Sequence, residues 1–251
     1  MFLPGIVSVT YRPMTPEQLV GAASHAGLSC IEWGGDVHVP HGDTDTAETV
    51  GALTRKAGLS VISYGTYYRA GTYGENFSSV FTDLLHTADA LGTQNLRLWA
   101  GSKNSEDVTA EERKALTEEL RLCAALASRW GKTISFEFHG GTLTNTAASA
   151  KQLIEDIGEH NVSLYWQPNQ FRSPKDNCDA LTLVLPYVSN VHVFAWEERQ
   201  RLPLAAHTDR WQDYLSILAS TGRDHGLLLE FVPQDDPTLL RGEAETLLSL
   251  L

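Results

Sequence analysis

The sequence predicts an α/β fold, a (β/α)8 TIM barrel in which eight parallel strands alternate with eight helices. Eight short runs of apolar, β-branched or aromatic residues recur along the chain, and their first residues lie 25 to 38 residues apart, about one strand-helix unit each time. Segments in which apolar residues follow helical spacing separate these runs. No composition shift and no Pro-, Gly- or Ser-rich linker divides the 251 residues. We therefore expect a single barrel domain over residues 1–251.

The predicted strands are short, as expected for a closed parallel barrel. They are Gly5–Val9, Cys30–Trp33, Ser60–Tyr64, Asn95–Trp99, Thr133–Phe138, Val162–Trp166, Val191–Phe194 and Gly226–Phe231. An open doubly wound sheet is the structural alternative. The first strand leads into Thr10-Tyr11-Arg12-Pro13, and no Gly-rich dinucleotide motif follows any early strand, which favours the barrel.

The predicted helices carry start and stop signals. They are Thr15–Ala26, Asp43–Ala57, Phe77–Leu91, Thr109–Ser128, Thr146–Ile157, Ala180–Leu185, Asp209–Ser220 and Thr238–Leu251. Thr15 and Thr109 can each accept a hydrogen bond from the first-turn amides of the helix that follows. Gly27, Gly58 and Gly92 permit the left-handed turn that ends a helix before the next strand.

Charge and cysteine content bound the function. Lys and Arg number 19 and Asp and Glu number 31, so a formal charge of −12 repels nucleic acids and anionic membranes, and we expect neither as a partner. No segment approaches the roughly 18 apolar residues of a membrane helix, and the first residues lack the basic region of a signal peptide. The three cysteines form no Cys-x-x-Cys pair, which favours a reducing compartment. We therefore expect a cytoplasmic protein.

Polar residues occupy positions that face the barrel lumen. In the fifth strand Ile134, Phe136 and Phe138 form the apolar set that faces the helices, so Glu137 and His139 point inward. The same rule turns Leu227, Leu229 and Phe231 of the last strand outward. It predicts a ring of inward polar residues near the carboxyl ends of the strands, where barrel enzymes carry out their chemistry: Glu32, Arg97, Glu137, Gln167, His192 and Glu230.

This ring holds three carboxylates and one guanidinium, an unbalanced set for an enclosed site. A divalent cation resolves the imbalance. Two carboxylates, an amide oxygen and an imidazole suit Mn, Mg or Co, with Zn also compatible, and the four candidate ligands are Glu137, Gln167, His192 and Glu230. The alternative is a buried polar network without metal, in which the carboxylates pair with Arg97 and His192.

The motifs that contain these residues resemble a known family, the sugar isomerases and epimerases with a xylose isomerase-like barrel, often grouped with the type IV apurinic endonucleases. The motifs are Cys30-Ile-Glu-Trp-Gly-Gly-Asp-Val-His38, Ser135-Phe-Glu-Phe-His139, Val191-His192-Val193 and Leu229-Glu230. The resemblance implies the same four metal ligands, with two departures. Gln167 stands where the family usually has Asp, and Gln170 stands where it has a substrate-binding His.

The resemblance implies proton transfer beside the carbonyl of a small sugar or polyol, through an enediolate, by a metal-dependent isomerase or epimerase. Glu137 and Glu230 are then the catalytic pair, one removing a proton and the other returning one. A lyase or dehydratase variant, acting on a polyol or keto acid, stays open. Family members are often dimers or tetramers, so a homo-oligomer is one option.

Several further residues are candidates for binding the substrate. They lie in the lumen ring, at strand ends or on the loops that follow the strands, where hydroxyl groups and ring faces of a sugar would lie. The candidates are Glu32, His38, Tyr64, Arg97, Trp99, His139, Gln170 and Arg199.

Two other functions remain as alternatives. A barrel that binds a sugar without turnover is supported by the neutral Gln167. A metal-dependent phosphodiesterase acting on abasic DNA would need further histidines on the second and third strands and a basic groove. The third strand ends in Ser63-Tyr64-Gly65-Thr66-Tyr67 without histidine, and the charge has the wrong sign.

Overall fold

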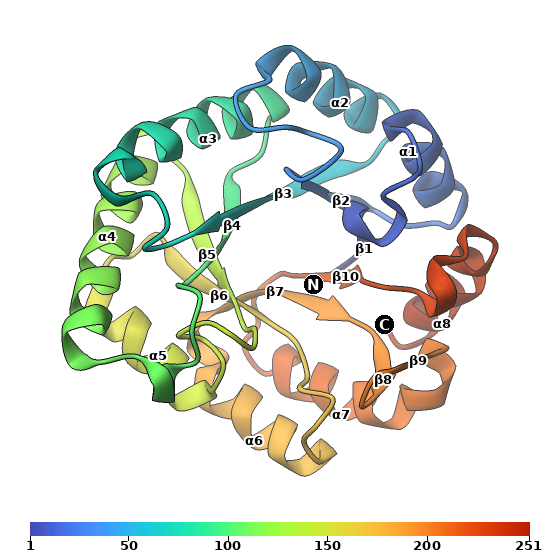
Figure 1. Cartoon of the computed structure of the whole chain (residues 1–251). Coiled ribbons are helices and arrows are strands. Elements are labelled where there is room, and N and C mark those ends of the chain that lie inside the picture. The colour runs from blue at the N-terminus through green and yellow to red at the C-terminus, as the bar shows by residue number, and fades with distance from the viewer.

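The computed structural model describes residues 1–251 and contains a closed barrel of parallel strands surrounded by helices (Figure 1). The strands follow the order β1-β10-β7-β6-β5-β4-β3-β2 around the barrel. The first and last of them close the ring, since Phe2 of β1 is in register with His225 of β10 and Ile6 with Leu229. The predicted (β/α)8 barrel is confirmed.

The barrel strands lie close to the predicted runs. They are β1 (Phe2–Val7), β2 (Cys30–Gly34), β3 (Ser60–Arg69), β4 (Asn95–Trp99), β5 (Thr133–Glu137), β6 (Val162–Trp166), β7 (Val188–Val193) and β10 (His225–Leu229). The third strand is longer than predicted and continues to Arg69. The first strand ends at Val7, and the chain then forms a 3-10 turn over Ser8–Tyr11.

The eight helices form the outer ring of Figure 1. They are α1 (Pro16–His25), α2 (Thr44–Lys56), α3 (Phe77–Leu91), α4 (Ala110–Arg129), α5 (Ala147–Ile157), α6 (Pro174–Val184), α7 (Thr208–Ala219) and α8 (Leu240–Ser249). Thr15 and Thr109 cap α1 and α4 as predicted. Helix α6 begins at Pro174 rather than at Ala180, because Ser173 accepts a hydrogen bond from the Asp176 amide and Pro174 suits the first helical position.

A short antiparallel hairpin follows β7 and was not predicted. It consists of β8 (Ala195–Glu197) and β9 (Gln200–Leu202), in which Trp196 pairs with Arg201. The turn places Glu198 in the left-handed region, at φ 51°. Three-residue strands are too short to show alternation in a sequence, so periodicity alone does not reveal them.

Side-chain alternation divides the barrel into an outer apolar layer and a polar lumen. Ile134 and Phe136 of β5 are buried in the large core between sheet and helices. Ser135, between them, points inward, where its hydroxyl lies 2.7 Å from that of Ser163 and accepts from the Asn95 amide at 2.6 Å. Hydroxyl and amide side chains in the lumen thus form hydrogen bonds with one another. The predicted alternation of side chains is confirmed for β5.

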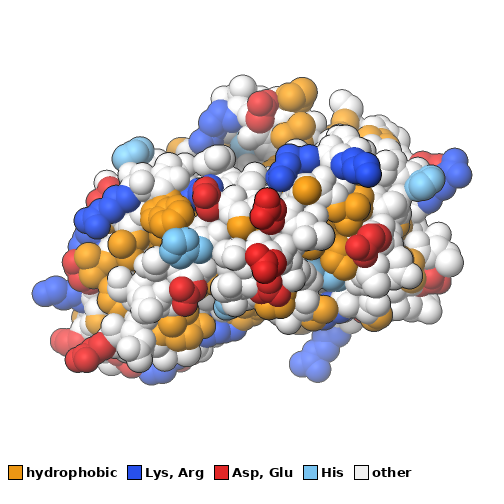
Figure 2. Space-filling view, turned by 90° about the horizontal axis from the view of Figure 1, so that it is seen from above, with side chains coloured by type: hydrophobic (Ala, Val, Ile, Leu, Met, Phe, Trp, Pro, Cys, Tyr) orange, Lys and Arg blue, Asp and Glu red, His pale blue; other side chains and the backbone are white.

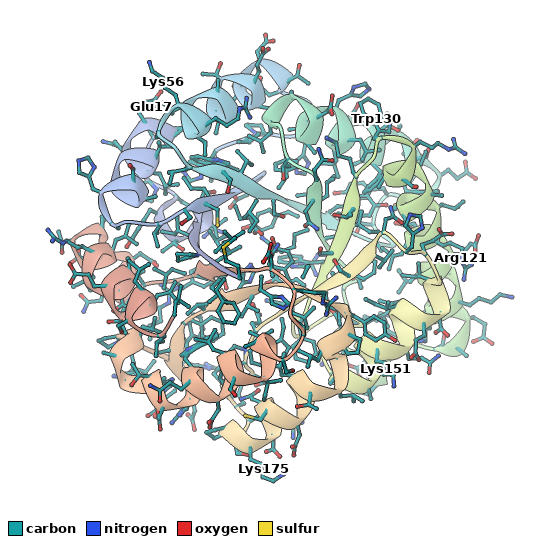
Figure 3. All side chains as sticks on the ribbon, turned by 180° about the vertical axis from the view of Figure 1, so that it is seen from behind. Glu17, Lys56, Arg121, Trp130, Lys151 and Lys175 are labelled. Carbon is teal, nitrogen blue, oxygen red and sulfur yellow. The ribbon has the colours of Figure 1, made fainter.

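Charged side chains cover the outside of the helix ring. In Figure 3 the labelled Lys56, Arg121, Lys151 and Lys175 point outward, away from the barrel. Figure 2 shows one side of the molecule, on which acidic and basic side chains are interspersed. No helix combines the length and the apolar character that crossing a membrane requires.

Candidate active site

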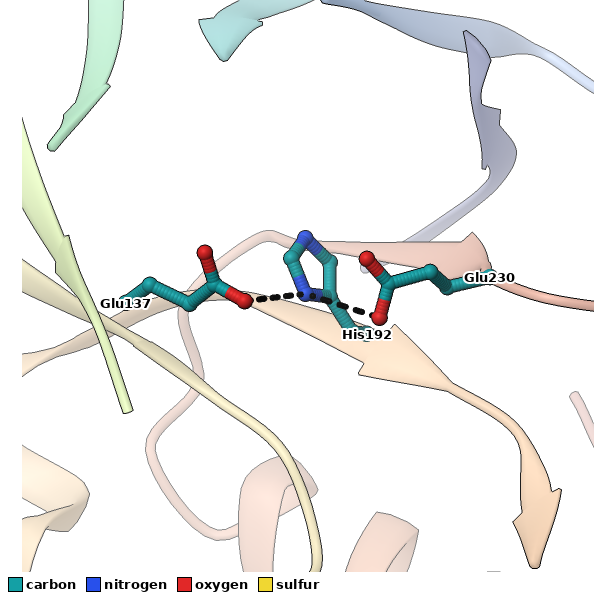
Figure 4. A group of neighbouring side chains, drawn as sticks. All are labelled: Glu137, His192 and Glu230. Carbon is teal, nitrogen blue, oxygen red and sulfur yellow. Dashed lines mark ion pairs between the residues drawn. The ribbon is translucent and has the colours of Figure 1, made fainter. Parts of the chain in front are cut away.

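Three buried side chains meet at the carboxyl ends of the barrel strands. Glu137 is the last residue of β5, His192 belongs to β7, and Glu230 directly follows β10. One ligand atom from each lies within 4.8 Å of the others. Figure 4 shows the two carboxylates on either side of the imidazole, with His192 Nδ1 at 3.8 Å from Glu137 Oε1 and 3.4 Å from Glu230 Oε2. The structure thus brings together three residues that the sequence predicts as site residues.

A cavity of about 390 Å³, here called the main cavity, opens above these groups. Glu137 and Glu230 contribute to its lining. Much of the remaining wall is aromatic, formed by Tyr67, Trp99, Phe171, Phe194, Trp196 and Phe231. Such a cavity encloses a small molecule and presents ring faces to its apolar surfaces.

Arg97 and Trp99 hold one oxygen of Glu137. The guanidinium, which is 2% exposed, donates from Nη1 to Glu137 Oε2, and the Trp99 indole N–H donates to the same oxygen. Burial alone would raise the pKa of Glu137, but the charges of Arg97, His192 and His139 and the hydrogen bond from Trp99 together outweigh it and keep that pKa below its usual range. Glu137 Oε1 is therefore the oxygen left for other partners.

Glu230 has a different environment. It accepts no hydrogen bond from another side chain, and its nearest charged neighbour is His192. Burial raises the pKa of this carboxyl; His192 opposes that shift and Glu137 adds to it. The two carboxyl groups across His192 are thus unequal in hydrogen bonding as well as in proton affinity.

His192 is oriented from both sides. Its Nδ1 lies 2.9 Å from Gln167 Oε1 and faces Glu137 and Glu230, while its Nε2 lies 3.8 Å from Glu32 Oε1. Burial disfavours the charged ring, but the surrounding carboxylates, with Glu230 first, raise the pKa of His192 overall. Nδ1 is therefore the nitrogen that faces the centre of the site.

The donor set fits a divalent cation. Glu32, Glu137 and Glu230 are at least nine-tenths buried, and Arg97 is the one cation buried among them. Three enclosed carboxylates against one guanidinium leave negative charge without a partner, which is costly unless a cation is present. Two carboxylate oxygens, His192 Nδ1 and an amide oxygen face one another, and hard divalent ions accept such a mixed shell.

The remaining predicted residues fall into two groups. Gln167, Arg97, Trp99, His139 and Gln170 line the main cavity. Trp99 and His139 stack there with ring centroids 5.3 Å apart. Their roles as ligands or substrate contacts stay predictions, because placement alone does not test them.

The other group lies away from the main cavity. The His38 ring is held by the Ser8 hydroxyl at 3.1 Å and the Met14 carbonyl at 3.0 Å. Glu32 lies beneath Arg97, whose Nε donates to it at 2.7 Å. The structure does not bring His38 or Glu32 into contact with the cavity space.

Tyr64 and Arg199 are likewise not part of the cavity lining. The Tyr64 hydroxyl donates to the Val39 carbonyl at 2.8 Å, so this side chain faces the outer layer. The reason is that β3 continues beyond Tyr64, which therefore lies within the strand rather than on a loop. Arg199 is an exposed residue in the turn between β8 and β9.

The prediction from strand alternation was wrong for Phe231. It was expected to face outward, but it lines the main cavity. Strand β10 ends at Leu229, and Phe231 adopts a left-handed conformation with φ 54°, so the two-residue period no longer applies. Arg12 and Asn145 also line the cavity and were not predicted. Their positions on loops after strand ends are the signal that could have identified them.

The chain matches the family model of the xylose isomerase-like TIM barrel over residues 20–250. It therefore belongs to the xylose isomerase-like TIM barrel family, as the motifs predict. Among curated proteins, a segment of 101 residues is 25% identical to a 3-dehydroshikimate dehydratase of Bacillus anthracis. That segment makes up 40% of this chain and 36% of the dehydratase, so the match spans little more than a third of the relative.

Solved structures share the fold over nearly the whole chain. A probable 3-DHS dehydratase from Bacillus anthracis has a TM-score of 0.83 at 18% identity, covering 99% of both chains. A 3-keto-D-glucoside 4-epimerase from E. coli has a TM-score of 0.74 at 15% identity, covering 100% of this chain and 99% of that one. A D-psicose 3-epimerase has a TM-score of 0.72 at 15% identity, covering 98% and 97%. These similar proteins are named as enzymes, but at such identities the likeness shows the fold alone.

Proposed function

We propose that the protein is a divalent-metal-dependent isomerase or epimerase that moves a proton next to the carbonyl group of a small sugar or polyol. The observation that carries this proposal is the placement of Glu137 and Glu230 on either side of His192, at the wall of one cavity. Two carboxyl groups that flank a bound substrate can remove a proton and return it, which both reactions require.

The contacts of the two carboxyl groups indicate which one removes the proton and which one returns it. Glu230 accepts no hydrogen bond from another side chain, so its lone pairs are free to take the proton from carbon. The C–H electron pair then forms the carbon–carbon double bond of an enediolate, while the π pair of the carbonyl bond moves onto the carbonyl oxygen. Glu137, fixed by Arg97 and Trp99 on the other side, would take up a proton from water and pass it to the neighbouring carbon in an isomerase or to the opposite face in an epimerase.

Glu137, Gln167, His192 and Glu230 are the residues that would hold the metal. A divalent ion there supplies positive charge for the oxyanion that develops during proton removal. The aromatic walls limit the water around this charge, which strengthens the electrostatic interactions of the buried groups.

Exchange with solvent deuterium tests the proposal. The purified protein, after metal analysis, is loaded with Mn, Mg or Co and incubated with a panel of ketoses and aldoses in D2O. We expect deuterium to enter one sugar at the carbon next to the carbonyl, as read by NMR. Glu230→Gln should remove the exchange and leave the circular dichroism spectrum unchanged. Metal-loaded protein that exchanges no sugar would contradict the isomerase and epimerase assignment.

A dehydratase is the second candidate, favoured by the sequence match to a 3-dehydroshikimate dehydratase. The same proton removal followed by loss of a hydroxyl group as water would give a carbon–carbon double bond conjugated to the carbonyl. Incubation with 3-dehydroshikimate, followed by ultraviolet absorbance, separates the two. New absorbance that requires Glu137 and Glu230 would favour the dehydratase. A sugar that binds by calorimetry but neither exchanges nor dehydrates would instead favour a binding protein.

A further inference from the structure

A second, narrower cavity of about 20 Å³ lies beside the main cavity and is here called the side cavity. The two share Pro168, Asn169, Gln170, Phe194 and Trp196 in their linings. A group bound in the side cavity would therefore be continuous with a molecule bound in the main cavity. Its volume corresponds to about one water molecule.

Two buried nitrogen atoms without hydrogen-bond partners belong to residues that line the side cavity. His207 is 5% exposed, and its Nε2 is buried without a hydrogen-bond partner. The indole Nε1 of Trp196 is also buried and unpartnered. Arg172 and Arg210 add two cationic side chains to the same lining. Buried donors normally have partners, so this set calls for an acceptor.

The backbone also contributes positive partial charge beside the side cavity. His207 is the N-cap residue of α7, and no side chain caps the first-turn amides of that helix. The first turn of a twelve-residue helix carries positive partial charge and N–H groups without intrahelical partners. This local group of basic side chains is opposite in sign to the formal charge of the whole chain, which is −12.

One carboxylate of the chain already reaches this place. Glu197 belongs to β8, which packs against the 3-10 turn Leu204–His207. Its Oε1 lies 3.3 Å from Arg210 Nη2 and 3.5 Å from His207 Nε2. The Glu197 side chain is 59% exposed, so solvent or a ligand can displace it. These contacts show that Arg210 and His207 can bind a carboxylate group.

We infer that the side cavity is an anion subsite, which takes one oxygen of a carboxylate or phosphate group of the substrate beside the place that the Glu197 carboxylate now reaches. Arg210 would supply the charge, and His207 and Trp196 would supply hydrogen bonds. The assignment of the anion to the substrate rests on the proposed function, whereas the subsite itself does not.

Indole NMR tests the subsite without any need for activity. The chain contains six tryptophans, so six indole N–H signals are expected, and Trp196→Phe identifies the signal of Trp196. Inorganic phosphate and acetate are titrated separately at constant ionic strength, with and without EDTA. We expect a saturable shift of the Trp196 signal that persists with EDTA. The anion that binds more tightly shows whether carboxylate or phosphate is preferred.

Two variants probe the assignment. Arg210→Gln should weaken anion binding roughly tenfold, the effect of losing one charge-assisted hydrogen bond. Glu197→Gln should tighten binding several-fold, because the internal competitor loses its charge. Arg241→Gln removes a guanidinium that pairs with Glu245 on α8 and should change nothing.

A Trp196 signal that fails to saturate with both anions would overturn the inference, and so would equal affinity in the wild type and Arg210→Gln. A Glu197→Gln protein that binds no tighter would also count against it, even if Arg210→Gln did not fold. Because these readouts work in EDTA, failure of the metal-dependent function leaves them unaffected.

Discussion

His192 Nε2 lies 3.8 Å from Oε1 of Glu32, and both side chains are fully buried. This nitrogen has no hydrogen-bond partner, and neither has the other carboxylate oxygen, Glu32 Oε2. The distance is longer than a hydrogen bond, so the carboxylate acts on the ring through charge. A carboxylate behind a ligating histidine is a common device for fixing the ring orientation. We expect Glu32 to help keep Nδ1 turned toward Glu137 and Glu230.

Glu32→Gln should therefore weaken binding of the metal. Loss of this charge behind His192 is expected to lower Mn affinity by roughly 10- to 100-fold, measured by calorimetry. The change also removes a charge from the buried pair with Arg97, so the free energy of unfolding should fall by about 3 kcal/mol. Glu17→Gln, on the exposed side of α1, is the matched control. Unchanged affinity in Glu32→Gln would show that His192 is oriented by other groups.

Gln167→Asp should strengthen metal binding. Gln167 Oε1 lies 2.9 Å from His192 Nδ1, and a carboxylate at this position adds negative charge to the ligand set. We expect Mn affinity to rise by roughly tenfold and the melting temperature with Mn to rise with it. Gln170→Asp puts the same charge elsewhere in the main cavity lining and should have a smaller effect. Equal effects of the two changes would mean that Gln167 is not a ligand.

Gly65→Ala should disturb the site without replacing any of its charged residues. A Cβ at this position would lie 2.7 Å from Arg97 Nη2 and 2.9 Å from Glu32 Oε1, closer than real Cβ atoms come to other atoms. The pair must shift, which should cost about 1–3 kcal/mol of stability and reduce metal affinity. Urea unfolding and Mn titration measure both. Gly21→Ala meets nothing within 4 Å in α1 and should be neutral or slightly stabilising.

Stability should fall as the pH drops through the range in which histidine takes up a proton. Burial lowers the pKa of His225, so the folded state favours the neutral ring, held by the Ser189 carbonyl at 2.8 Å. A histidine with a lowered folded pKa contributes stability that is present above its unfolded pKa of about 6.5 and lost below it.

Urea unfolding of the wild type and His225→Gln at pH 7.5 and pH 5.5 checks this. The variant should lose less stability between the two pH values than the wild type does. His160→Gln, an exposed change, serves as the control. Equal pH dependence in all three proteins would exclude His225 as a contributor.

The sequence is informative about the site where strands alternate regularly. The two-residue period placed Glu137 and His192 in the lumen because both lie within regular strands. It failed for Phe231, which follows the end of β10. Tyr64 was expected at a strand end, but it lies inside a strand longer than its apolar run. Strand ends depend on tertiary contacts, and those are absent from a local pattern.

The hydrophobic pattern of the sequence could not predict the short hairpin or the contacts between individual side chains. The hairpin that presents Trp196 and Glu197 is too short to show a period, and the side cavity beside it arises from segments far apart in the chain. The role of Glu32 behind His192 likewise depends on a distance between two strands. Alternation could place both residues in the lumen, but only the three-dimensional arrangement shows which groups they face.

The pairing of β1 with β10 has a consequence for how the protein matures on the ribosome. Glu32 and Arg97 are synthesised early, but Glu230 follows the strand that closes the ring. A nascent chain cannot bring Glu230 beside His192 until that strand pairs with Val191–Val193 on one side and Phe2–Ile6 on the other. Glu230 therefore joins the other buried carboxylates only after β10 has been synthesised and paired, so nascent chains that lack this strand lack the complete side-chain cluster.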